Sequence, residues 1–559
     1  MLIAQIRSYK QQISDMEYRK PILIIVLFLF WSGLFSQQQP EKSLHYRAGD
    51  WVTYSDFRQI TSVAIGNQYI YFGTYSGIIR YNFFTNKWAE PLTVSDGLPS
   101  GAVRCVAYDK STGFLWCSAG RSLCYYLPAA LEWRVFNIHD YEISYISKLG
   151  VGDKNVWAKG PDGVYSVDSF GNGITTSQNN LAEKDNVKWM PSLGDRRKND
   201  WPQYFMQDGY RFFRNGIIQD RYFREFPVTV WLSDSFGTLW FGTMGLGSGK
   251  IDTRSDNAEI LQFGLFQKNV SFIEWAGDGM WIGGRSADRK ESGITYWNME
   301  TEEWVYFEPD YIQGLQSCNV NAVSSGEKYV WFGTDNGLVR YNTVKDVWRT
   351  FHVNDGLWDE LVLSLIQDGR YLWIGTDAGL NRVDLLSGYM EKVKTKELTH
   401  RRIFCLEVTG KTLWAGSDRG IFSFDIEHGT WMYRSGASDM PVMDVYAVSS
   451  WENEIWFGTD YGVEVYNSDT DKWRSFLPAH YPTGSKINTI LADSAFVWFG
   501  TDNGILKYIK NEERWFRYTV KDGLISNKVN WILLDGDYVW AATSKGLTRF
   551  LWNAPYRID

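Results

Sequence analysis

The chain of 559 residues has little of several features that mark common classes of protein. It has only five cysteines, an odd number without CxxC spacing, which argues against a disulfide framework or a zinc site. Its six histidines are scattered, and no Gly-x-Ser-x-Gly elbow, phosphate loop or dinucleotide fingerprint occurs. A basic surplus is also missing, since the net charge is −8, and this argues against a nucleic-acid partner. We therefore expect no cofactor, no metal and no catalytic residues.

Long apolar runs are also scarce, and the one that is present lies near the N-terminus, over residues 22–35. It is shorter than the about 20 apolar residues that span a bilayer. A basic flank, Arg19-Lys20, and a small residue at the exit, Ser36, complete the pattern of a secretory signal. The sequence predicts a signal peptide over residues 1–36, with Met16 as a second candidate start, and a linker over 37–50. An uncleaved anchor is the alternative.

Without a later apolar segment of sufficient length, we expect no membrane span after signal cleavage. The protein is then exported, to the periplasm, the cell surface or the extracellular space.

Aromatic residues are abundant: 28 Trp, 33 Tyr and 32 Phe make up 17% of the chain. Aromatic side chains favour strands, and 51 Gly against 14 Pro indicates many tight turns. The composition therefore favours an all-β fold.

A repeat decides which all-β fold this is. The segment Val330-Trp331-Phe332-Gly333-Thr334-Asp335-Asn336-Gly337-Leu338 recurs about every 42 residues. The regular units are anchored by Trp331, Trp373, Trp414, Trp456, Trp498 and Trp540, and weaker units by Tyr71, Trp116, Trp157, Trp240 and Trp281. One more degenerate unit is expected over residues 210–218, which makes about twelve units.

Each unit divides into four short strands, with Asp335-Asn336-Gly337 as a hairpin turn in the unit of Trp331. Four strands in a repeat of this length are typical of a β-propeller blade. We predict about twelve four-stranded blades in two propellers, residues 51–275 and 276–550, followed by a tail over 551–559. The division can be six plus six or five plus seven. The strand over residues 51–54 matches a fourth strand and is expected to complete the last blade.

The motif Trp-Phe-Gly-Thr-Asp-Asn-Gly-Leu, then Tyr-Asn, then Trp-x-x-Phe-x-x-x-Asp-Gly-Leu, carried in full by residues 331–357, resembles the two-component regulator propeller repeat. In that family, paired propellers form the extracytoplasmic sensor part of hybrid histidine kinases, notably in Bacteroidetes, and often respond to glycan fragments. The resemblance covers most of residues 51–550 and implies a binding role. The immunoglobulin-like module, membrane helix and kinase of such sensors are not found in this chain.

Most recurrent residues have a structural explanation. The Trp anchors are expected in the core between blades, and the acids of the Thr-Asp-x-Gly turns, such as Asp335, are expected to bond local backbone N–H groups. Cys105 and Cys405 stand where other units carry small residues, which predicts buried strand positions. A bridge from Cys105 to Cys117 or Cys124 is an alternative.

Candidate ligand-binding residues are those that propeller geometry would place at a channel or that depart from the repeat. First strands line the channel of a propeller, and their polar position holds Arg104, Asn321, Asn488 and Asn530 in four units. These side chains can also serve as hydrogen-bonding links between blades. The aromatic candidates outside the repeat pattern are Trp358, Trp531 and Tyr461.

Three functions remain from the sequence. The first is an exported, non-catalytic propeller protein that binds a glycan or a protein partner. The second is a polysaccharide lyase or hydrolase with a propeller fold, and the third is a scaffold subunit of an envelope or secretion complex with a protein partner in the envelope.

Overall fold

The computed structural model describes residues 46–558 except 169, 171–172, 178–181, 183–184, 196–200, 207–208, 289–291, 435–442 and 478–484. The predicted signal peptide over 1–36 and the second candidate start Met16 lie outside the described residues, as does most of the predicted linker. The chain divides into two units, Met1–His45 with Asn553–Asp559, and Tyr46–Trp552. In the first unit, residues 553–558 contain turns. The account below concerns the second unit.

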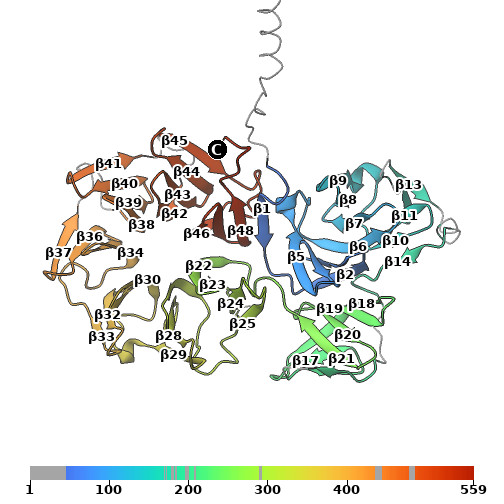
Figure 1. Cartoon of the computed structure of the whole chain (residues 1–559), viewed down its shortest axis with the longest axis horizontal. Helices are drawn as coiled ribbons and strands as arrows, with labels where there is room; N and C mark the ends of the chain where they lie inside the picture. Colours follow the sequence, from blue (N-terminus) through green and yellow to red (C-terminus); the bar gives the residue numbers. More distant parts are fainter. Residues whose placement is uncertain are drawn as a thin grey trace, which may run out of the picture. The chain divides into compact units, whose positions relative to one another are not determined.

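Seven four-stranded antiparallel sheets form one ring, drawn in green to red in Figure 1 except for one blue strand from near the N-terminus. Their innermost strands lie side by side in chain order, and the last of them lies beside the first, which closes the ring. These innermost strands are β22 (Val270–Ala276), β26 (Val320–Ser325), β30 (Val362–Asp368), β34 (Ile403–Thr409), β38 (Val445–Trp451), β42 (Ile487–Ala492) and β46 (Val529–Asp535).

The second, third and fourth strands of each blade follow outward in chain order. They are β23 (Gly279–Gly284), β24 (Ile294–Asn298), β25 (Trp304–Phe307), β27 (Tyr329–Thr334), β28 (Gly337–Asn342), β29 (Val347–Phe351), β31 (Tyr371–Thr376), β32 (Gly379–Asp384), β33 (Met390–Lys392), β35 (Thr412–Ser417), β36 (Gly420–Asp425), β37 (Thr430–Arg434), β39 (Glu454–Thr459), β40 (Val463–Asn467), β41 (Lys472–Phe476), β43 (Phe496–Thr501), β44 (Gly504–Ile509), β45 (Arg514–Tyr518), β47 (Tyr538–Thr543) and β48 (Gly546–Leu551).

The last blade takes its outer strand from the other end of the chain. Strand β1 (Trp51–Tyr54) pairs antiparallel with β48, and the Trp51 ring stacks on Phe550 with the centroids 3.9 Å apart. Residues 51–54 therefore belong to the ring of seven blades, in the position that the sequence assigns to a closing fourth strand. This pairing covers the edge of β48 with a strand from the other end of the chain, which is how the ring is held shut.

Every innermost strand of this ring carries a β-bulge after its first residue. In β26, for example, the register with β27 shifts between Val320 and Ala322, so Asn321 is the bulged residue. The bulged residues of the seven strands are Ser271, Asn321, Leu363, Phe404, Tyr446, Asn488 and Asn530. A bulge re-aims the side chain that it inserts, and here all seven line one cavity at the ring centre.

Residues 60–261 form four further sheets. Their strands are β2 (Ile60–Ile65), β3 (Tyr69–Thr74), β4 (Ile78–Asn82), β5 (Lys87–Leu92), β6 (Val103–Asp109), β7 (Phe114–Ala119), β8 (Ser122–Leu127), β9 (Glu132–Asn137), β10 (Lys148–Val151), β11 (Asn155–Lys159), β12 (Val164–Asp168), β13 (Ile174–Ser177), β14 (Lys188–Trp189), β15 (Phe205–Met206), β16 (Arg211–Phe212), β17 (Ile217–Gln219), β18 (Glu225–Ser233), β19 (Thr238–Thr243), β20 (Ser248–Asp252) and β21 (Asn257–Leu261). Neighbouring sheets meet through β18, β2, β6 and β10 in that order. We call this part the first ring and the seven blades the second ring.

The described residues thus form eleven sheets, and the degenerate unit expected over residues 210–218 is not a blade of its own. Its strands β16 and β17 extend the sheet of β18 to β21. The physical reason is the length of β18, which pairs with β17 through residues 225–227 and with β19 through 228–233. The predicted domain boundary after residue 275 also differs from the structure, because β22 begins at Val270 and is the innermost strand of a second-ring blade.

The Trp anchors lie in the core between blades. Trp331 is 3% exposed and packs with Val362, Leu372 and Ile374 of the following blade. The same position is filled by Trp456 against Ile487 and by Trp498 against Val529. In this way the indole side chain of one Trp in each blade supplies the contact that holds each pair of neighbouring sheets together.

All five cysteines are free thiols. Cys105 is fully buried, Cys405 is partly buried, and the predicted alternative of a bridge from Cys105 is not formed. Cys117 and Cys124 face each other across β7 and β8 with their Sγ atoms 3.4 Å apart. Across the described part of the chain, no helix has the length and apolarity needed to cross a membrane.

Candidate functional site

Two of the cavities that gather polar side chains lie at the centre of the second ring and at the junction of the two rings, and the first of these is described first. It measures about 440 Å³ and is lined by the seven bulged residues together with Arg285, Lys486, Lys528 and Asp502. We call it the axial cavity. Four of the sequence-predicted site residues meet here: Asn321, Asn488, Asn530 and Trp531. The cations and Asp502 come from the loops that join fourth to first strands and second to third strands.

The asparagines of the axial cavity link neighbouring blades. The Nδ2 group of Asn321 donates to the Val362 carbonyl at 2.8 Å, and that of Asn488 donates to the Val529 carbonyl at 2.9 Å. Asn530 donates in the same way to Val270 at 2.6 Å, across the point where the ring closes. Each acceptor is the first residue of the next innermost strand, so these side chains contribute to ring closure as well as to the cavity wall.

The other predicted site residues lie apart from this cavity. Arg104 occupies the bulge of β6 in the first ring, with its guanidinium 5.1 Å from the Tyr145 ring centre. Trp358 packs against Gly379, where an added Cβ would come within 3.1 Å of its ring, and Tyr461 is 54% exposed in a hairpin turn. Trp531, inside the cavity, stacks on Phe272 with the centroids 3.9 Å apart. The structure therefore does not bring the seven predicted residues into one site.

The sequence predicts that the aspartates of the Thr-Asp-x-Gly turns accept hydrogen bonds from local backbone N–H groups, and the structure shows a different arrangement. In the turn after β27, the local bonds are made by Thr334, whose hydroxyl donates to the Gly337 carbonyl at 2.8 Å and accepts from the Asn336 N–H at 3.1 Å. The carboxylate of Asp335 instead accepts from Ser317 and Asn319 on the loop that enters the blade, at 2.6 and 2.9 Å. The threonine holds the turn, which leaves the acid free to anchor the neighbouring loop.

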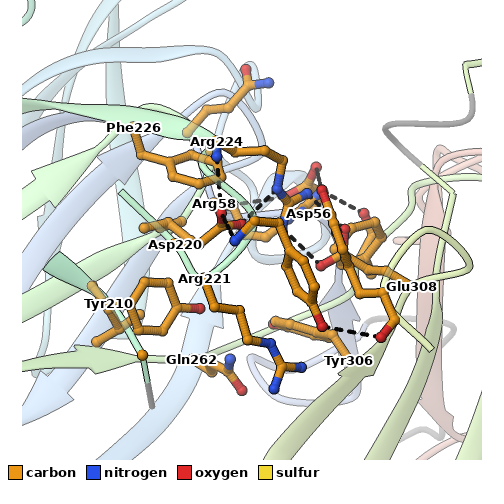
Figure 2. Close-up of a pocket in the computed structure, with 18 of the residues that line it drawn as sticks. Asp56, Arg58, Tyr210, Asp220, Arg221, Arg224, Phe226, Gln262, Tyr306 and Glu308 are labelled. Carbon is orange, nitrogen blue, oxygen red and sulfur yellow. Dashed lines mark hydrogen bonds and ion pairs between the residues drawn. The ribbon is translucent and has the colours of Figure 1, made fainter. Parts of the chain in front are cut away.

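The second cavity lies where the chain passes between the rings, and it measures about 560 Å³ (Figure 2). We call it the junction pocket. Residues 55–59 connect β1 to β2, and residues 262–269 connect β21 to β22. The two connections run side by side, because Asp56 bridges to Gly264 and the Leu265 N–H donates to the Ser55 carbonyl at 2.9 Å. Gly264 has φ +89°, and an added Cβ would lie 2.6 Å from the Ser55 carbonyl oxygen, so the close approach requires glycine.

Arg58 fastens the two connections to each other. Its guanidinium makes two hydrogen bonds to the Asp56 carboxylate, at 3.0 and 3.1 Å, and one to the Phe266 carbonyl at 2.7 Å. It also lies 3.9 Å above the centre of the Phe266 ring. With its donors directed at these partners, Arg58 is a structural element of the pocket floor.

A second arginine joins the two rings directly. Arg224, at the end of the loop before β18, bonds the Glu308 carboxylate of the second ring at 2.7 and 3.1 Å and the Asp220 carboxylate at 2.7 Å. Burial tends to lower the pKa of Arg224, but the hydrogen bonds that it donates to Glu308 and Asp220, together with their negative charges, outweigh this effect and raise the pKa above its usual range. Beside it, the rings of Tyr222 and Tyr311 stack with the centroids 3.7 Å apart.

Other polar groups of the junction pocket are available to bind a ligand. Arg221 is exposed, lies 4.8 Å from the Tyr222 ring centre, and has no ion pair with any acid that the structure describes. Gln262 is exposed on the pocket wall (Figure 2). Asp56, Asp220 and Glu308, in contrast, are all paired with arginine. Such a pocket can bind a polar ligand through a guanidinium, an amide and tyrosine rings, whereas its carboxylates are engaged in holding the rings.

Sequence reasoning did not find the junction pocket. Its residues come from segments 55–59, 209–226, 245–266 and 306–312 and follow no repeat. The basic cluster Arg221 to Arg224 around two aromatics was the one local signal, and it lies in the degenerate part of the chain.

No family model and no curated protein matches the chain. Among solved structures, it is similar to PorZ, an essential surface component of the type-IX secretion system of Porphyromonas gingivalis, with TM-score 0.58 and 11% identity over 90% of this chain and 87% of that one. Extracellular domains of two hybrid two-component systems from B. thetaiotaomicron match with TM-scores of 0.45 and 0.32 and identities of 14% and 15%, over 89% of this chain and 70% and 82% of theirs. The similarity to PorZ and the four-stranded sheets of the described residues confirm the predicted β-propeller fold.

Proposed function

We propose that this protein is an exported, non-catalytic recognition protein that binds a glycan or a protein partner in the junction pocket. The observation that carries the proposal is a cavity between two rings that presents the Arg221 guanidinium beside tyrosine rings, without an ion pair to any of the described acids. Ligand sites occur preferentially at such interfaces, with a few polar groups on an otherwise apolar wall.

Binding is favoured over hydrolysis by the state of the carboxylates. An acid/base pair in a glycosidase needs two carboxyl groups that are free to give and take protons. Asp56, Asp220 and Glu308 instead hold Arg58 and Arg224. A lyase or hydrolase would have to work elsewhere in the molecule.

A thermal-shift screen tests the proposal. The chain from Gln37 onward is melted in the presence of a glycan library, because a ligand that binds only the folded state raises the melting temperature. We expect a hit whose shift is lost in Arg221→Ala and kept in Arg517→Ala, which removes an exposed arginine on β45. Equal shifts in both variants would place the ligand outside the pocket, and turnover of a polysaccharide would overturn the non-catalytic role.

A second candidate function is a scaffold subunit of an envelope or secretion complex. The observation that favours it is the similarity to PorZ over 90% of this chain. Under this proposal the glycan library produces no hit, and cross-linking in the source envelope recovers one protein partner in stoichiometric amount. Loss of that partner in Arg221→Ala would place it at the junction pocket as well.

A further inference from the structure

The axial cavity of the second ring differs in charge from the rest of the molecule. Arg285, Lys486 and Lys528 line it together with one acid, Asp502, which makes a net charge of +2 from three cations and one anion. The whole chain carries −8. A cleft lined by one sign of charge concentrates ligands of the opposite sign.

These cations have no ion-pair partner among the described residues. The ammonium of Lys486 lies 3.3 Å above the centre of the Tyr446 ring instead, and the carboxylate of Asp502 accepts a hydrogen bond from Asn488 at 2.9 Å. Asp335, the acid that attracts Arg285, already accepts from Ser317 and Asn319.

The three cations stand on three different blades at the cavity, where Arg285 and Lys528 are exposed and Lys486 is half-buried. Burial lowers the pKa of Lys486, although Asp502, Asp444 and Asp460 attract it. The charged groups are therefore within reach of a ligand.

Several neutral polar groups of the cavity already donate hydrogen bonds to the protein. The amide groups of Asn321, Asn488 and Asn530 are directed at backbone carbonyls of the next blade, and the Ser271 hydroxyl is bonded to the Val320 carbonyl. The three cations are the positively charged donors of the cavity.

We propose that the axial cavity is an anion-binding site in which Arg285, Lys486 and Lys528 receive a phosphate, sulfate or carboxylate group of a ligand. The site is separate from the junction pocket and goes beyond the function proposed for it. A group of this size fits a cavity of about 440 Å³ with room for the part of the ligand that carries it. The apolar bulged residues Leu363 and Phe404 supply a wall for that part.

Inorganic phosphate is the probe for the test. The chain from Gln37 onward is titrated with phosphate against chloride at constant ionic strength, and the half-saturating concentration is read from the thermal shift. We expect the double variant Lys486→Gln/Lys528→Gln to raise that concentration at least tenfold. Lys521→Gln, an exposed cation on the same loop as Lys528 that does not line the cavity, is expected to leave it unchanged.

Equal half-saturation in the double variant and in Lys521→Gln, or no effect of phosphate beyond that of chloride on the wild type, would overturn the proposal. Should the double variant fail to fold, Arg285→Gln provides the same test from another blade. Arg221→Ala is expected to keep phosphate binding, so failure of the axial site and failure of the junction pocket give different results. Nuclear magnetic resonance of sulfate- and carboxylate-bearing sugars then shows which anion is preferred.

Discussion

The guanidinium of Arg224 on the first ring forms two parallel hydrogen bonds with the carboxylate of Glu308 on the second ring, at 2.7 and 3.1 Å. Their side chains are 30% and 18% exposed, so the pair is only partly screened by solvent. Bidentate pairs of this kind add orientation as well as attraction. This contact couples the two rings in addition to the ion pairs Lys87–Glu302 and Arg549–Glu90 and to an apolar core that both rings share.

The first prediction concerns that coupling. Arg224→Ala is expected to lower the free energy of unfolding by about 1–3 kcal/mol, because it leaves two carboxylates without their partner. A double-mutant cycle with Glu308→Gln, measured by urea unfolding, should give a coupling energy of about 1–2 kcal/mol. The exposed pair Lys411–Glu427 is the control and should give below about 1 kcal/mol. Equal coupling in the two cycles would mean that Arg224 does not hold the rings together.

A second prediction tests closure of the second ring. Trp51→Ala removes an indole side chain that is 2% exposed and stacked on Phe550. The substitution should lower the free energy of unfolding by about 3–5 kcal/mol. Trp451→Ala, at the exposed end of β38, should cost below about 1 kcal/mol. Denaturant unfolding measures both. If the two variants were equally stable, β1 would not be needed to close the ring.

The hairpin turns allow a third prediction. Thr334→Val removes a fully buried hydroxyl that makes two bonds within the turn, and we expect a loss of about 1–3 kcal/mol in unfolding free energy. Asp335→Ala removes exposed bonds to a loop and should cost less, about 1 kcal/mol or below. If thermal unfolding showed a greater loss of stability for Asp335→Ala than for Thr334→Val, the aspartate would be the residue that holds the turn.

The fourth prediction is a pH dependence. Burial raises the pKa of Glu274 to about 7, against hydrogen bonds from Ser325 that tend to lower it. The folded state therefore holds a proton that the unfolded state releases, and stability is greatest below about pH 4.5 and falls as the pH rises through 7. At ~1.4 kcal/mol per pKa unit this contribution is on the order of 3–4 kcal/mol.

Glu274→Gln should remove this decrease of the unfolding free energy with pH. The variant therefore gains stability relative to the wild type as the pH rises from 5 to 8. Glu407 occupies the same place on β34 beside Ser450, and burial shifts its pKa in the same direction. The double variant should therefore show a flatter profile than either single variant. Parallel wild-type and variant profiles over this range would contradict the prediction.

Much of the fold could be predicted because it depends on a local residue pattern that recurs in successive units. The Trp anchors at positions such as Trp331 and Trp498 recur at one period, and a large apolar residue at a fixed place in every unit has to be buried between units. The strand over residues 51–54 also carries the pattern of a fourth strand, and the last blade lacks one. The degenerate segment over residues 210–218 has no such pattern, which is why its place in the sheet of β18 could not be predicted.

The candidate sites were predictable only in part. Asn321, Asn488 and Asn530 share one repeat position, so their common place on the axial cavity follows from the repeat. Arg285, Lys486 and Lys528 lie on loops of variable sequence, and only closure of the ring brings them to one cavity. The bulge that turns each of the asparagines toward the cavity has no signature in the repeat.

The sequence by itself determined the four-stranded blade, the core between blades and the strand that closes the last blade, because each carries the side-chain pattern of the repeat. The tertiary structure alone decided that seven blades close the second ring, and it alone brought Arg58, Arg224 and Glu308 to one pocket. The physical reason is separation along the chain: residues that no local pattern relates become neighbours only when whole sheets pack and the chain crosses between rings.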